Sequence, residues 1–170
     1  MPPSSEKAKK GKEFEGSLVS KIKTQAKKYG VQFVRLYDSF SGFTKGGMVQ
    51  VRIPGQWSDF IFMFKESKCC FVEFKYTESG NFHLGMLSDS QRLGFESSLV
   101  NDILYFVLVF CDIEKKYYML NSKRILELNP KKIASRRFNL KETFPAESLE
   151  SHKEIFQFLN KNYNLVGNKL

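Results

Sequence analysis

The sequence has few of the residues that build disulfide frameworks or zinc sites. Three cysteines and two histidines occur among its 170 residues: Cys69, Cys70, Cys111, His83 and His152. The cysteines are odd in number, lie in apolar strand-like runs and form no Cys-x-x-Cys pair, and the histidines are far apart. This pattern argues against a disulfide framework and predicts that the protein binds no zinc and that its thiols are reduced, buried and inert.

Long apolar runs and acidic residues are also scarce. Residues 1–12 are polar and lysine-rich without the apolar segment of a signal peptide, and no stretch approaches the length of a membrane span. There are 18 acidic residues against 27 basic ones, which gives a net charge of +9. Such a surplus favours a polyanionic partner, nucleic acid before an anionic membrane surface. We therefore expect a soluble cytoplasmic protein that binds no membrane.

The chain has enough apolar residues for a core of its own. Hydrophobic residues make up 42% of it, including 17 phenylalanines, and 170 residues suit one domain. Hydrophobic periodicity predicts helices over 12–29, 88–100, 122–128 and 148–163, the first ended by Gly30 and the second capped by Ser88. It predicts strands over 31–37, 57–64, 69–76, 103–111 and 115–120.

The order of these elements predicts the fold class and the domain organisation. Helices alternating with strands in this way favour an α/β fold, with a central mixed β-sheet flanked by helices. We expect a disordered basic arm over 1–11 and a mobile loop or arm over 38–56. The remaining residues, 12–170, are expected to form one domain, with a core over about 12–121 and a C-terminal extension over about 122–170.

Charged residues are embedded in the two most conspicuous strands. Asp59 follows Trp57 and Ser58, and the run from Cys69 to Tyr76 carries Glu73 and Lys75 on one face because strand side chains alternate. Two carboxylates and an ammonium can hold a divalent metal through hard oxygen ligands and place water beside a cation, as phosphodiester hydrolysis requires. The alternative is a half-buried ion pair on an edge strand.

Four pieces of the sequence together carry a family resemblance. They are residues 11–15, which end in Glu15, then Asp59, then residues 73–75, and then Ser90 with Gln91. In this order they resemble the PD-(D/E)xK nucleases, and within them the Holliday junction resolvases of the RecU and Hjc types, over roughly residues 10–111. Ser58 stands where many members have proline. Residues 38–56 are shorter than the RecU-type stalk, and residues 112–170 match nothing in the family.

The resemblance implies a restriction-endonuclease-like domain and a role for each motif residue. It implies that Asp59, Glu73 and the main-chain carbonyl of Phe74 bind Mg²⁺, or Mn²⁺, and that Glu15 completes the metal shell or binds a second ion. Lys75 would orient and help deprotonate the attacking water, and Gln91 would hold that water or the scissile phosphate. Taken singly, Glu15 is also explained by the helix dipole and Gln91 by helix capping.

The implied substrate is a branched DNA, cut in two symmetric places by a homodimer. Phosphate contacts are expected from basic residues spread along the chain: Lys12, Lys45, Arg52, Arg92, Arg136 and Arg137. The implied location is the nucleoid, or the host cytoplasm if the chain is phage-encoded. Two alternatives stay open: another PD-(D/E)xK endonuclease of restriction or repair type, and a non-catalytic nucleic-acid-binding module.

Overall fold

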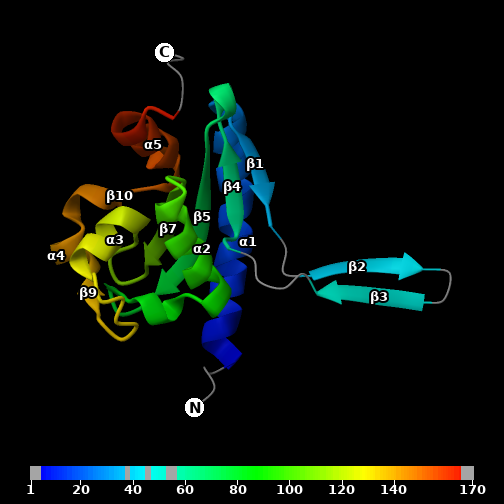
Figure 1. Ribbon diagram of the computed structural model, residues 1–170, viewed down its shortest axis with the longest axis horizontal. Coiled ribbons are helices and arrows are strands. Elements are labelled where there is room, and N and C mark those ends of the chain that lie inside the picture. The colour runs from blue at the N-terminus through cyan, green and yellow to red at the C-terminus, as the bar shows by residue number, and fades with distance from the viewer. Residues whose placement is uncertain (1–4, 37–38, 45–46, 53–56, 166–170) are drawn as a thin grey trace.

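A six-stranded mixed sheet forms the centre of the protein (Figure 1). The computed structural model describes residues 5–36, 39–44, 47–52 and 57–165. In the first of these ranges side chains are described from residue 13 onward, and over 39–52 the backbone alone is described. In spatial order, the strands are β1 (Gln32–Arg35), β4 (Phe60–Met63), β5 (Cys69–Thr77), β7 (Leu104–Cys111), β8 (Lys116–Asn121) and β10 (Ser148–Leu149).

The two central strands, β5 and β7, are the one parallel pair of this sheet, and the other neighbours are antiparallel. Helix α2 (Asp89–Val100) lies between β5 and β7 in the chain and makes the crossover that a parallel pair needs. All but the first residue of β7 are buried. Its uninterrupted apolar sequence is typical of a strand that is covered on both faces.

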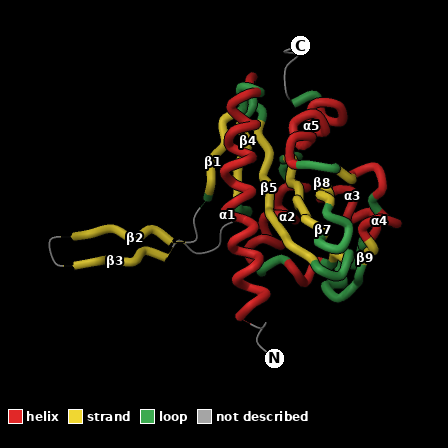
Figure 2. The backbone as a smooth tube through the Cα atoms, turned by 180° about the vertical axis from the view of Figure 1, so that it is seen from behind, coloured by secondary structure: helices red, strands yellow, loops and turns green. Residues whose placement is uncertain are grey.

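Helices cover both faces of the sheet (Figures 1 and 2). Helices α1 (Ser5–Lys28) and α5 (Ile155–Tyr163) pack on the face that carries Val72, Phe74 and Phe106. Helices α2 and α3 (Ser122–Leu128) pack on the opposite face, with Tyr105 and Val107. The predicted α/β class with a central mixed sheet flanked by helices is therefore confirmed.

Helix termini follow their sequence signals closely. Helix α1 ends with Gly30 in the left-handed region at φ 68°. The amides of Gly30 and Val31 donate to the carbonyls of Lys27 and Ala26, as in a Schellman motif.

The start of α1 differs from the expectation, because the helix begins at Ser5. Residues 5–11, expected as part of a disordered arm, are strong helix formers apart from Ser5 and Gly11 and extend the helix.

A two-stranded hairpin occupies most of the segment that was expected to be a loop or arm. Strands β2 (Ser39–Thr44) and β3 (Gly47–Arg52) pair antiparallel and separately from the central sheet. Figures 1 and 2 show the hairpin pointing away from the rest of the chain. The alternation of Met48, Val49, Gln50 and Val51 favours a strand, and it outweighs the glycines and serines around it. The arm is thus an ordered ribbon in its two described strands.

The C-terminal residues form more short elements than expected. The predicted helix over 148–163 is shorter, because Ser148 and Leu149 pair with β8 as strand β10 and the α-helix starts only at Ile155. The segment 130–144, for which no element was predicted, contains β9 (Phe138–Asn139) and α4 (Leu140–Thr143). β9 pairs with β6 (Asn81–Phe82). Within the described residues there are also four 3₁₀ helices: Lys65–Ser67, Leu84–Met86, Pro145–Glu147 and His152–Glu154.

Two expectations about composition can be checked directly. All three cysteines are free thiols, but Cys69 is exposed at the start of β5, whereas Cys70 and Cys111 are buried as expected. Cys69 is the first residue of its strand and pairs with the exposed Met63, so no core covers it. Within the described residues, every helix is too short or too polar to cross a membrane.

Candidate active site

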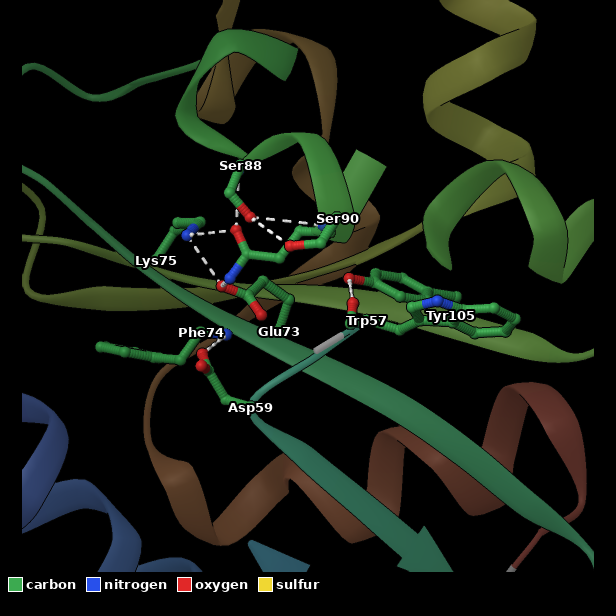
Figure 3. A network of polar contacts seen from close by, with 9 residues as sticks. Trp57, Asp59, Glu73, Phe74, Lys75, Ser88, Ser90 and Tyr105 are labelled. Atoms are coloured by element: carbon green, nitrogen blue, oxygen red, sulfur yellow. Dashed lines mark hydrogen bonds and ion pairs between the residues drawn. The ribbon is translucent and has the colours of Figure 1, made fainter. Parts of the chain in front are cut away.

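Three polar side chains from β5 and α2 form a closed set of contacts (Figure 3). Lys75 Nζ lies 2.7 Å from Glu73 Oε1 and donates to Gln91 Oε1 at 3.1 Å. Gln91 Nε2 donates to the same Glu73 Oε1 at 2.5 Å. Glu73 and Lys75 meet because they are two residues apart on one strand face, as the alternation predicted.

Gln91 serves the helix cap and the polar set at once. Its Oε1 accepts a hydrogen bond from the backbone amide of Ser88 at 2.9 Å, and the backbone amide of Gln91 donates to Ser88 Oγ at 3.3 Å. This reciprocal pair is a capping box. The capping interpretation of Gln91 is therefore confirmed, and the capping box fixes the side chain that reaches Glu73.

Glu73 is the most constrained carboxylate of the site. Its side chain is 1% exposed, and its second oxygen, Oε2, is buried without a hydrogen-bond partner. Burial, and then the negative charge of Asp59, raise the pKa of Glu73 to about 8, although Lys75 opposes the shift. A buried carboxylate oxygen that lacks a donor is costly unless a cation meets it.

Asp59 stands at the start of β4 and faces the middle of β5. Its Oδ2 accepts from the backbone amide of Phe74 at 2.8 Å. In a strand, the amide and carbonyl of one residue point to the same edge. The Phe74 carbonyl therefore shares the edge that Asp59 faces, where β4 has not yet begun to pair. Two carboxylates and one carbonyl thus meet at this edge.

The segment that carries Asp59 is braced from two sides. Tyr105 on β7 donates its hydroxyl to the carbonyl of Trp57 at 2.5 Å, and Ser58, 1% exposed, donates to the carbonyl of Phe60 at 3.0 Å. Trp57 also packs directly on α2: a Cβ added at Gly94 would lie 2.4 Å from Trp57 Cβ. This contact holds the Asp59 segment close against the helix that carries Gln91.

Glu15 and Arg35 form an ion pair beside these groups. Arg35 Nη2 on β1 lies 2.6 Å from Glu15 Oε1 on α1. Burial, and then the charge of Asp59, raise the pKa of Glu15, while Arg35 and Lys75 lower it. Glu15 is therefore within electrostatic reach of Asp59 and Lys75. Arg35 was not predicted, because one arginine on a short strand carries no sequence signal.

The oxygen set fits a hard divalent cation. Among the described residues, no three His, Cys, Asp or Glu side chains form a group that could hold a metal. Glu15 is engaged by Arg35, so the set consists of Asp59, Glu73 and the Phe74 carbonyl. The unpartnered Oε2 of Glu73 supplies a reason for a cation at this place, and oxygen-only ligation favours Mg²⁺ or Mn²⁺ over zinc.

The expected DNA-binding residues are scattered. Arg92 lies in the first turns of α2, where its guanidinium pairs with Asp89. Lys12 and Arg52 are positions on α1 and β3 whose side chains are not described, and Lys45 lies outside the described residues. The structure therefore brings Glu73, Lys75 and Gln91 together and places Arg92 on the helix that carries Gln91.

No protein-family model matches the chain, and no curated protein sequence matches it either. A solved structure does: Hjc of Archaeoglobus fulgidus, a Holliday junction resolvase from an archaeal hyperthermophile. The superposition has a TM-score of 0.51 at 14% identity and covers 84% of this chain and 98% of that one. At this identity, the likeness shows a shared fold.

Proposed function

We propose that the protein is a metal-dependent, structure-selective DNA endonuclease that resolves four-way junctions by paired, symmetric phosphodiester hydrolysis. The observation that carries the proposal is the buried, unpartnered Oε2 of Glu73, which adjoins Asp59 and has the ammonium of Lys75 beside its other oxygen. The sequence motifs resemble the RecU and Hjc resolvases, and the fold is similar to that of Archaeoglobus Hjc.

Asp59, Glu73 and the Phe74 carbonyl would hold Mg²⁺, or Mn²⁺. The ion would polarise the scissile phosphate and stabilise the charge on the leaving oxygen. Glu15 is a candidate for a further ligand, on condition that it leaves its contact with Arg35.

In this proposal, Lys75 would act on the attacking water. Its Nζ is held by two acceptors, Glu73 Oε1 and Gln91 Oε1, so the ammonium is fixed before substrate arrives. A preorganised cation of this kind orients water and offsets the negative charge that grows on the phosphoryl oxygens. Gln91 is itself fixed by the helix cap, and therefore it holds Lys75 and Glu73 in register.

The substrate class is proposed from charge and from the resemblance. The net charge of +9 suits a polyanion, with Lys12, Lys45, Arg52 and Arg92 as candidate phosphate contacts. Two symmetric cuts require two active sites related by a two-fold axis, so we propose a homodimer. The proposed location is the cytoplasm, at the nucleoid or in an infected host.

A panel of DNA substrates tests the proposal. We expect cleavage of a mobile four-way junction with Mg²⁺, slower or no cleavage of a matched linear duplex and single strand, and no cleavage in EDTA. Equal cleavage of junction and duplex would favour another endonuclease of the PD-(D/E)xK type. Binding to all of them without any cleavage would favour a non-catalytic nucleic-acid-binding module.

A further inference from the structure

A short basic loop follows α3, and three of its four cations form no ion pair within the described residues. Residues 130–137 contain four basic side chains, all exposed: Lys131, Lys132, Arg136 and Arg137. Lys132 Nζ lies 2.7 Å from Glu96 on α2. Within the described residues, no carboxylate forms an ion pair with the other three, Lys131, Arg136 and Arg137.

The loop has a fixed shape. Asn129, which is fully buried, accepts from the amide of Ile133 at 3.1 Å and donates to its carbonyl at 3.0 Å. Lys132 adopts a left-handed φ of 52°, an unfavourable conformation for a residue with a side chain. Arg136 lies over the ring of Phe138, 5.6 Å from its centroid. The cations are therefore displayed from an ordered backbone.

The same loop is fastened beside the candidate active site. The amide of Gly85 donates to the carbonyl of Ala134 at 2.9 Å. Gly85 lies three residues before Ser88, the cap of α2, and Lys132 reaches Glu96 on the same helix. The loop thus touches α2 and the segment that leads into it, and α2 carries Gln91. A molecule lying along the start of α2 passes close to these cations.

We propose that loop 130–137 binds the phosphate backbone of a DNA duplex arm that continues past the cleavage site. Exposed guanidinium groups suit phosphate oxygens because their planar donors meet two oxygens at once. A cation without an acidic partner can neutralise a phosphate without first breaking an ion pair. Each phosphate that is neutralised releases counterions from the DNA, and this release favours binding. The inference rests on the proposed function for its placement of DNA at α2, and it gives the C-terminal extension a role in substrate affinity.

A charge-matched pair of triple variants tests the loop. The loop variant is Lys131→Ala, Arg136→Ala and Arg137→Ala. The control is Lys27→Ala, Lys28→Ala and Lys153→Ala, which removes three exposed cations from the end of α1 and the turn before α5. Binding to a four-way junction is measured in EDTA, which prevents metal-dependent cleavage, over a series of salt concentrations.

We expect the loop variant to bind at least about tenfold more weakly at low salt, with a log–log salt slope shallower by about two to three, at roughly 0.9 for each lost phosphate contact. The control should change much less. Equal losses in both variants, or no loss in the loop variant, would overturn the inference. So would loop-dependent binding to phosphatidylserine vesicles without loop-dependent binding to DNA. The double variant Lys131→Ala and Arg137→Ala keeps Arg136 on Phe138 and serves if the triple variant unfolds.

Cleavage separates this inference from the proposed function. At saturating enzyme, the loop variant should cut the junction at the wild-type rate, because Glu73, Lys75 and Gln91 are untouched. If wild-type protein cuts no DNA while the loop variant still binds DNA more weakly than the control, the proposed function fails and the loop inference stands. If wild type cuts and both variants bind alike, the loop inference alone fails.

Discussion

At the scale of single residues, Glu73 shows how a buried carboxylate opposes stability. Burial raises its pKa to about 8, so the folded protein without metal holds a proton on Glu73 that the unfolded chain, with an ordinary value near 4.5, does not hold. Between these two values the folded state binds more protons than the unfolded state. The free energy of unfolding contributed by Glu73 is therefore lost as the pH rises from about 4.5 to about 8.

Glu73→Gln should remove this loss, because a neutral amide has no charge to desolvate. One pKa unit corresponds to about 1.4 kcal/mol, so the effect is on the order of a few kcal/mol at pH 8.5. We expect metal-free wild type to lose thermal stability from pH 5 to pH 8.5, and Glu73→Gln to lose less. The exposed Glu127→Gln is the control. Parallel melting curves for wild type and Glu73→Gln would contradict the assignment.

Lys75 is the residue whose loss should affect chemistry with little effect on the fold. Its side chain is 19% exposed and contacts Glu73 and Gln91. Lys75→Ala should lower the single-turnover rate of DNA cleavage by roughly a hundredfold or more, the size expected when one preorganised charge is lost at a reacting phosphate. Circular dichroism should stay unchanged. A wild-type rate in Lys75→Ala would return Lys75 to a structural ion pair.

At the scale of elements, the contact between Trp57 and α2 joins two halves of the site. Gly94→Ala should push the 57–59 segment away from α2, because the new Cβ would lie 2.4 Å from Trp57 Cβ. We expect cleavage that needs more Mg²⁺ for half-maximal rate and is at least several-fold slower at saturation. Gly16→Ala on α1 is the matched control, since nothing lies within 4 Å of a Cβ there. Similar Mg²⁺ profiles in the two variants would show that this brace does not position Asp59.

The hairpin β2–β3 is the element that we expect to distinguish a junction from a duplex. It is close to Asp59 in sequence, and Figure 1 shows it projecting away from the central sheet. An extended ribbon of this kind can reach the open centre that only a branched DNA has. Replacing residues 42–51 with a shorter Gly-Ser linker should leave duplex affinity nearly unchanged and reduce the preference for a four-way junction, measured by competition binding. An unchanged preference would assign recognition to the dimer geometry.

The sequence was most informative where a signal is local. The alternation around Glu73, the apolar run of β7, the glycine that ends α1 and the capping residues of α2 each predicted their element, because each depends on neighbours within a few positions. Arg35 and the brace on Trp57 depend on contacts between distant segments, which no local pattern encodes. Residues 148–163 read as one helix, because their apolar spacing does not reveal that Leu149 pairs with Tyr117.

At the scale of the whole molecule, the fold separates the proposed metal-binding centre from surfaces that carry positive charge. The centre lies at the edge between β4 and β5, where the buried Glu73 and the partly buried Asp59 come together despite the net charge of +9. The basic loop at 130–137 lies beside α2, and the hairpin projects from the other side of the sheet (Figure 1). This arrangement suits one long polyanion that touches several parts of the surface and is cut at one place.

The cleavage rate of a four-way junction by wild type and Asp59→Asn, at saturating enzyme with Mg²⁺, tests the central claim most directly. Removing one negative ligand should weaken metal binding without removing a phosphate contact. We therefore predict that Asp59→Asn loses cleavage by at least about a hundredfold while its junction affinity in EDTA is retained or increased. Cleavage by Asp59→Asn at the wild-type rate, with the same dependence on Mg²⁺, would contradict the account.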